Sequence, residues 1–72
     1  MKILKTTADG RFAIAGRNEE AKEERFWSCR YFVLDREKGD GILGVDFETD
    51  SLKTAEAALN MRVRSAARQT AE

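Results

Sequence analysis

The stretch that decides the fold is Phe-Trp-Ser-Cys-Arg-Tyr-Phe-Val-Leu at residues 26–34. Aromatic and β-branched residues favour strands, and this run is the strongest strand signal in the chain. Successive side chains of a strand point to opposite faces of its sheet. One face would carry Trp27, Cys29, Tyr31 and Val33 without a charge, and the other would carry Phe26, Ser28, Arg30, Phe32 and Leu34. We therefore predict a strand at about 26–35 with its Trp27 face in the core.

Three further strands are expected around this one. Residues 2–8 and 11–16 are β-prone and are separated by Asp9-Gly10, a dipeptide typical of tight hairpins. A turn-rich segment then leads into a last strand at about 41–48, whose Leu43, Val45 and Phe47 would face inward. The intervening residues 17–25 are almost all charged and lack apolar periodicity, which predicts a long exposed loop, with a solvated helical turn as the alternative.

From Thr49 onward the apolar residues recur at helical spacing. Ser51 or Thr54 can cap a helix over about 51–70. Its apolar stripe is Ala55, Leu59, Val63, Ala66 and Thr70. A sheet needs a partner to bury its apolar face, so we predict an α+β fold in a single domain over residues 1–72. An antiparallel three- to four-stranded sheet would pack against one C-terminal helix.

The composition excludes several classes of protein. The chain has 72 residues, with 13 Lys and Arg balanced by 13 Asp and Glu, no His and one Cys. Without histidine the commonest general base near neutral pH is missing, and Ser–His or Cys–His nucleophiles are impossible within one chain. The lone Cys29 cannot close an intramolecular disulfide, and no zinc-ligand set exists. We predict a cytoplasmic protein that is not an enzyme and uses no cofactor or metal, with no membrane span.

The neutral net charge hides a segmented pattern. Residues 35–50 hold six acidic and two basic residues, whereas both ends of the chain are basic. Carboxylates along a turn and strand can imitate nucleic-acid phosphates and occupy a basic groove. The alternative is a solvated face with acids that favour the helix start. The acidic candidates for partner binding are Glu37, Asp40, Asp46, Glu48 and Asp50.

Arg30 and Phe32, with Phe26 nearby, form a second candidate binding surface on the outer sheet face. Aromatic and arginine side chains together suit stacking on bases or anchoring a protein partner. The alternative is a secondary apolar cluster covered by the charged loop. Arg62, Arg64 and Arg68 in the last half of the helix can touch phosphates or simply complement the helix dipole.

Two resemblances to known families bear on function. Trp27-Ser28-Cys29-Arg30-Tyr31, Leu43-Gly44, Phe47 and Thr54-Ala55-Glu56-Ala57-Ala58 together resemble ethylene-response-type DNA-binding domains, and integrase arm-binding domains look similar. That resemblance implies a three-stranded sheet that enters the major groove and is backed by the helix. This chain departs from it because the sheet region is not basic. In size, layout and segmented charge the chain also resembles short phage-encoded anti-CRISPR and anti-defence proteins, which are often non-enzymatic inhibitors with an acidic working face.

The leading hypothesis is a small binding protein that blocks or modulates a protein or nucleoprotein partner, as an anti-CRISPR-like inhibitor of a nucleic-acid-handling complex. The first alternative is a sheet-type DNA- or RNA-binding module that uses Arg11, Arg25 and Arg30. The second alternative is a regulatory homodimer, since so small a core gains stability from association.

Overall fold

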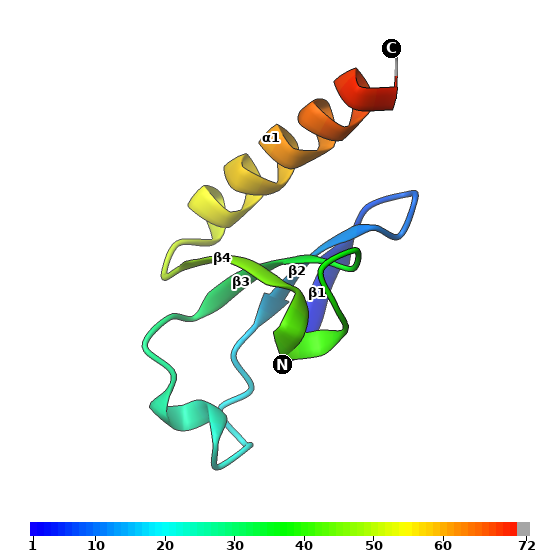
Figure 1. Cartoon of the computed structure of the whole chain (residues 1–72). Coiled ribbons are helices and arrows are strands. Elements are labelled where there is room, and N and C mark those ends of the chain that lie inside the picture. Colours follow the sequence, from blue (N-terminus) through cyan, green and yellow to red (C-terminus); the bar gives the residue numbers. More distant parts are fainter. Residues whose placement is uncertain (71–72) are drawn as a thin grey trace.

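The four-stranded antiparallel sheet and the C-terminal helix confirm the predicted α+β class (Figure 1). The computed structural model describes residues 1–70. The strands are β1 (Lys2–Thr6), β2 (Phe12–Gly16), β3 (Tyr31–Asp35) and β4 (Val45–Thr49), and the helix is α1 (Leu52–Thr70). Two short 3-10 helices, η1 (Glu24–Phe26) and η2 (Gly41–Gly44), precede β3 and β4. Each strand pairs with the next along the chain, in the order β1-β2-β3-β4.

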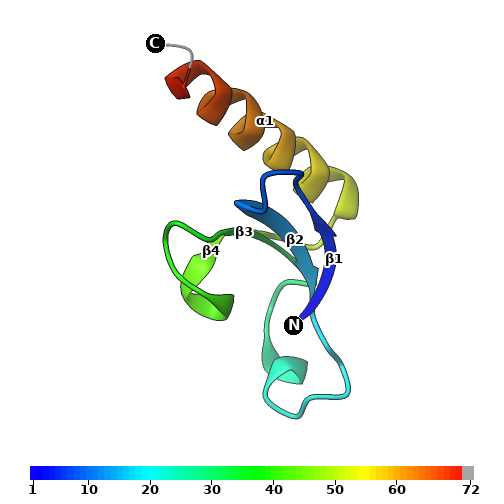
Figure 2. The ribbon, with the colours of Figure 1, turned by 90° about the vertical axis from the view of Figure 1, so that its right-hand side faces the viewer.

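The sheet has one face covered by the α-helix and one face without an α-helix. Helix α1 lies along one side, whereas the segment carrying η1 and the turn carrying η2 lie on the opposite side (Figures 1 and 2). We call these sides the helix-covered face and the helix-free face. Strand β2 is buried along its whole length, because its alternate residues contribute to both faces.

The helix-covered face holds the larger core. Its buried residues are Phe12, Ile14 and Val33 from the sheet and Ala55, Ala58 and Leu59 from the helix. The predicted stripe is confirmed at Ala55 and Leu59, while Val63 is 40% exposed and the side chain of Thr70 lies outside the described residues. The hydroxyl of Ser51 accepts the Thr54 N–H at 3.2 Å, which caps the helix as expected.

The amino-terminal hairpin forms at the predicted place with a longer connection. Strand β1 ends at Thr6 and β2 begins at Phe12, so the connection contains more than Asp9 and Gly10. Gly10 has φ +76°, a conformation that glycine adopts without strain. The Asp9 carboxylate accepts hydrogen bonds from the Thr7 hydroxyl and the Arg11 N–H, and both lower the pKa of Asp9.

The strand predicted at 26–35 is shorter, and its predicted core face was wrong in part. Strand β3 begins at Tyr31, so Trp27 and Cys29 do not follow its alternation and pack on the helix-free face. The backbone N–H of Arg30 donates to the Asp50 carboxylate at 3.0 Å, and the Trp27 carbonyl accepts from Arg17 at 2.7 Å. Side chains thus take two backbone groups that a longer β3 would pair with its neighbours, while the Arg30 carbonyl still accepts the backbone N–H of Arg17 at 2.8 Å.

The strand predicted at 41–48 begins only at Val45, which corrects two inward positions. Residues 41–44 form η2, and Leu43 is 76% exposed. The register then shifts, because Phe47 pairs with Val33 but Val45 pairs with Leu34. The extra residue, Asp46, reverses the alternation, so Val45 joins the helix-free face while Phe47 faces the helix.

Residues 17–25 form a largely exposed connection, as predicted, with one buried carboxylate. Glu24 is 8% exposed at the start of η1. Its carboxylate lies 2.6 Å from the Met1 amino group and accepts the Asn18 N–H at 3.1 Å. The contact with the ammonium, followed by the bond from Asn18, lowers the pKa of Glu24. The connection is therefore attached to the beginning of β1.

Candidate functional site

The helix-free face has an apolar floor built from alternate residues of the two central strands. Ala13 and Ala15 of β2 and Phe32 and Leu34 of β3 are all buried there. The two alanines are short, so the layer above them comes from elsewhere in the chain. Trp27 supplies it, packing edge to face on Phe32 with ring centroids 5.3 Å apart and planes at 85°. One tryptophan thus covers part of the face that α1 does not cover.

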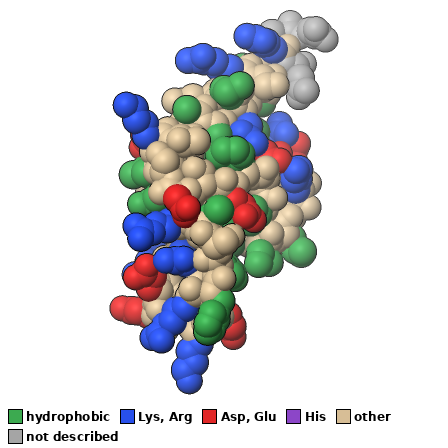
Figure 3. Space-filling model, turned by 90° about the vertical axis from the view of Figure 1, so that its left-hand side faces the viewer, with side chains coloured by type: hydrophobic (Ala, Val, Ile, Leu, Met, Phe, Trp, Pro, Cys, Tyr) green, Lys and Arg blue, Asp and Glu red, His purple; other side chains and the backbone are tan. Residues whose placement is uncertain are grey.

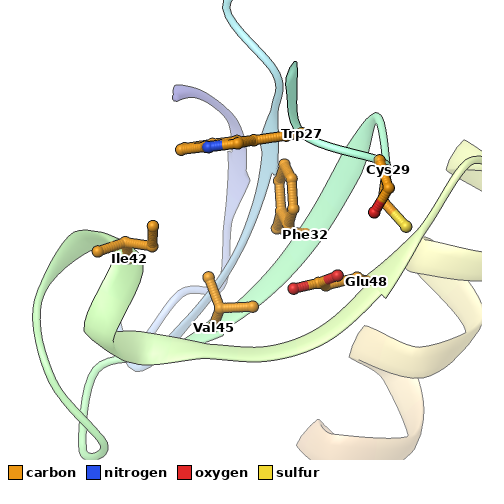
Figure 4. A pocket seen from close by; sticks show the side chains of 7 residues that line it. Trp27, Cys29, Phe32, Ile42, Val45 and Glu48 are labelled. Carbon is orange, nitrogen blue, oxygen red and sulfur yellow. The ribbon is translucent and has the colours of Figure 1, made fainter. Parts of the chain in front are cut away.

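A hollow of about 340 Å³ lies beside this aromatic pair. We call it the Trp27 hollow, and Figure 4 shows Phe32 and Val45 at its base, Trp27 and Ile42 at its sides and Glu48 pointing in from β4. Its lining residues are Trp27, Ser28, Cys29, Phe32, Ile42, Val45 and Glu48. Ile42 at the rim is 61% exposed, so apolar surface continues outward from the hollow.

A second hollow of similar volume, about 340 Å³, opens along the same face. It is lined by Met1, Ile3, Ala13, Leu34, Arg36, Gly39, Asp40 and Gly41. Ile3 on the outer strand β1 is 54% exposed. The turn that carries η2 contributes to both hollows, through Gly41 to one and Ile42 to the other. The helix-free face is therefore hollowed at two neighbouring places.

The structure divides the predicted acidic surface between different parts of the fold. Asp46 lies toward the helix, where Lys38 contacts one carboxylate oxygen at 2.6 Å and Arg62 contacts the other. These bonds, from Lys38 first and then Arg62, hold the pKa of Asp46 below its ordinary value. Glu48 instead lines the Trp27 hollow on the helix-free face, because the extra residue at Asp46 breaks the alternation that would otherwise put residues 46 and 48 on one face.

The remaining predicted acids are also separated from one another. Glu37 pairs with Arg11 at 2.9 Å, and Asp50 accepts the backbone N–H of Arg30. Asp40 is exposed beside the second hollow. On the side of the molecule in Figure 3, acidic side chains occur as separate groups with basic side chains between them. The acidic stretch of the sequence therefore does not form a continuous track on that side.

The expectation that Phe32 is an exposed anchor is wrong. Its side chain is only 4% exposed, because Trp27 packs on it. The alternative interpretation of the sequence, a secondary apolar cluster on the outer face, describes this region better. Arg30 is exposed, and the strongly exposed aromatic residue is Phe26, at 87%.

The sequence did not indicate that Ile42 and Trp27 line one hollow. Strand alternation assigns Trp27 to the opposite face, and residues 41–44 resemble the start of a strand. The usable signal was the pattern Phe-Ala-Ile-Ala at 12–15, which puts large residues on one face and alanines on the other. A face floored by alanines leaves space that another segment must fill.

The arginines of the nucleic-acid hypothesis have different environments. Arg11 donates to the buried Asp35 at 3.2 Å and also pairs with Glu37. Its hydrogen bond to Asp35 helps raise the pKa of Arg11. Arg25 donates from Nε to the Glu19 carbonyl at 3.0 Å, whereas Arg30 is exposed. Arg11 is thus largely neutralised within the fold.

Comparisons with protein-family models, with curated proteins and with solved structures give no match for this chain. No helix in the described part of the chain is both long and apolar enough to cross a membrane. Within residues 1–70, no three potential metal ligands are grouped to hold an ion.

Proposed function

We propose that this chain is a non-enzymatic binding protein that docks on a macromolecular partner through its helix-free face. The observation that carries the proposal is the hollowed apolar surface around Trp27, continued outward by exposed Ile42 and Leu43. Contiguous apolar surface beside aromatic residues is typical of protein-binding sites. The sequence supports a binding role over a catalytic one, because it contains no histidine.

A narrower form of the proposal makes the partner a nucleic-acid-handling complex, which the chain would inhibit in the manner of anti-CRISPR proteins. Its support is the exposed carboxylates Asp40 and Glu48, which line the two hollows and would meet a basic partner surface. Asp46 is left out of this surface, since Lys38 and Arg62 already pair with it.

Site-specific photo-cross-linking tests the broader proposal. A photoreactive phenylalanine analogue replaces Leu43 in one variant and Asn60, an exposed position on α1, in the control variant. In cells of the native host we expect a discrete cross-linked product from position 43 and not from position 60. Adding Ile42→Asp to the first variant should remove the product, because a charge then enters the apolar rim. Equal products from both positions, or a product insensitive to Ile42→Asp, would contradict docking through this face.

The narrower proposal is tested by Asp40→Lys combined with Glu48→Lys. Both positions are exposed, so the fold should survive the double change. We expect loss of the cross-linked partner and of any inhibition of its nucleic-acid binding. If cross-linking is lost but nucleic-acid handling by the partner is never affected, the partner belongs to another class and only the broader proposal stands.

A sheet-type nucleic-acid-binding module is the second candidate function. Exposed Arg30 favours it, whereas the pairing of Arg11 with Asp35 and Glu37 reduces the available positive charge. A gel-shift titration with duplex DNA and with RNA at low salt tests this second candidate function. A complex that weakens steeply with salt and with Arg30→Ala would support the module, and absence of any complex would remove it.

A further inference from the structure

We propose that the Trp27 hollow receives a lysine or arginine side chain of a protein partner. This proposal rests on the proposed function and specifies the chemistry that the docking surface recognises. The aliphatic stem of the side chain would lie against Trp27, Ile42 and Val45, and its charged end would meet Glu48. Lysine and arginine combine such a stem with a terminal charge, and aromatic rings attract cations.

The charge of the hollow favours a cation. Glu48 is the one charged residue among the described residues that line the hollow. The other lining residues are apolar or small. Figure 4 shows its carboxylate directed toward the space between Phe32 and Val45. Within residues 1–70, no ion pair or side-chain hydrogen bond involves Glu48, in contrast to Asp46 two residues earlier. A carboxylate at an apolar surface gains more from an incoming cation than one already paired.

The charge of the neighbouring surface indicates the side from which this cation enters the hollow. An adjoining hollow shares Ser28 with the Trp27 hollow and is lined by Arg17, Arg30 and Asp50. Arg17 there pairs with Glu19 at 3.0 Å, but the exposed Arg30 beside it disfavours another cation, so the β4 side, beside Glu48, is the favoured side for entry. The volume of about 340 Å³ lies near the lower end of ligand-pocket sizes, roughly 300–1,000 Å³. One long side chain with its flanking backbone suits this space better than a large cofactor.

A displayed library of random peptides is the probe, because it samples many side-chain combinations without requiring that the partner be identified. Wild-type protein should retain peptides that carry Lys or Arg beside an aliphatic residue. Trp27 is the only tryptophan in the chain, so binding in the hollow should change its fluorescence. Replacing the peptide's Lys or Arg with Met should weaken binding about tenfold, which is the loss expected for one charge-assisted contact.

Glu48→Gln should weaken the binding of the same peptides by a similar factor. The matched change Glu56→Gln, at an exposed position on α1, should leave their binding unchanged. The two losses should not add when Glu48→Gln is combined with the Met peptide, because each removes the same contact. Peptides that shift Trp27 fluorescence without Lys or Arg, or losses that simply add, would overturn the cation assignment and leave docking at this face intact.

Two further outcomes separate this proposal from the proposed function. Suppose that the retained peptides bind the Ile42→Asp variant as tightly as the wild type and do not change Trp27 fluorescence. That result would contradict docking on the helix-free face altogether. A dimer of this chain, detected by light scattering and dissociated by Glu48→Gln, would mean that a second copy occupies the hollow. That result would overturn the assignment to a different partner protein.

Discussion

The two faces of the sheet use alternate residues of the same strands but are closed in different ways. Strand β2 gives Phe12 and Ile14 to the helix-covered face and Ala13 and Ala15 to the helix-free face. The first face is closed by a long regular helix, which buries Leu59 to 1% exposure. The second is closed by an irregular segment and one tryptophan, which leave two hollows. This difference indicates that one face mainly stabilises the fold while the other is available for binding.

Removing the central helix contact should produce the largest effect. Leu59→Ala leaves a cavity between α1 and the sheet, because Leu59 is among the most completely buried side chains. We expect a loss of about 3 kcal/mol in the free energy of unfolding, measured by urea denaturation. Met61→Ala, at a position that is 69% exposed on the same helix, is the control and should change little. A loss below about 1 kcal/mol for Leu59→Ala would show that the helix contributes little to stability.

Removing the tryptophan should have a smaller effect, because its side chain is only partly buried. We expect Trp27→Ala to cost about 1–2 kcal/mol, measured by urea denaturation followed by circular dichroism, from lost apolar contact and the ring pair with Phe32. Trp27→Phe should restore part of that loss. If Trp27→Ala costs as much as Leu59→Ala, the two faces contribute equally and the proposed division between them fails.

The ion pairs of Asp46 join the turn before β4 to α1 and should make stability depend on pH. Because the pKa of Asp46 is lowered by folding, its contribution is present above the ordinary value of 3.8 and disappears as pH falls through the lowered pKa. The difference in unfolding free energy between wild type and Asp46→Asn should be about 1 kcal/mol at pH 7. It should shrink toward zero in acid.

The comparison with Asp46→Asn isolates this group, because Asp9 and Glu24 also have lowered pKa values and titrate in both proteins. A difference that stays constant from neutral pH down to strong acid would show that the ion pairs of Asp46 contribute nothing measurable.

The smallest effect on stability is expected at the rim of the helix-free face. Leu43 is 76% exposed, so Leu43→Ser should change the unfolding free energy by no more than about 0.5 kcal/mol. The same substitution should reduce cross-linking from a photoreactive residue at Ile42, because Leu43 extends the docking surface. Thermal denaturation checks the first expectation. A stable variant with undiminished cross-linking would exclude Leu43 from the docking surface.

Most of the fold could be predicted from the sequence because local signals agreed with one another. The 3.6-residue spacing of Ala55 and Leu59 identified the helix, and Ser51 was one of the two predicted caps at its start. Strand ends were less predictable, since they depend on distant partners. The N–H of Arg30 is taken by the Asp50 carboxylate, twenty residues later, and β3 begins only at Tyr31, although strand propensity favoured an earlier start.

Less of the candidate site could be predicted, because it depends on which face each residue reaches. A single extra residue at Asp46 moved Val45 to the opposite face. The charge pattern included Glu48, which lines the Trp27 hollow, but its closeness to Asp46 in sequence did not mean that the two residues share a surface. The sequence put Phe32 on the correct face but predicted it to be exposed. It is buried because Trp27 packs on it, and the position of Trp27 depends on an irregular segment.

The consecutive order of the strands has a consequence for how quickly the chain folds. Every strand pairs with its neighbour in sequence, so no pairing must wait for a distant segment to arrive. The chain also has no proline, whose slow isomerisation delays folding in many other proteins. Refolding after rapid dilution from urea should therefore be a single fast phase, with β2 and β3 at its centre and α1 docking onto a sheet that forms by adjacent pairings.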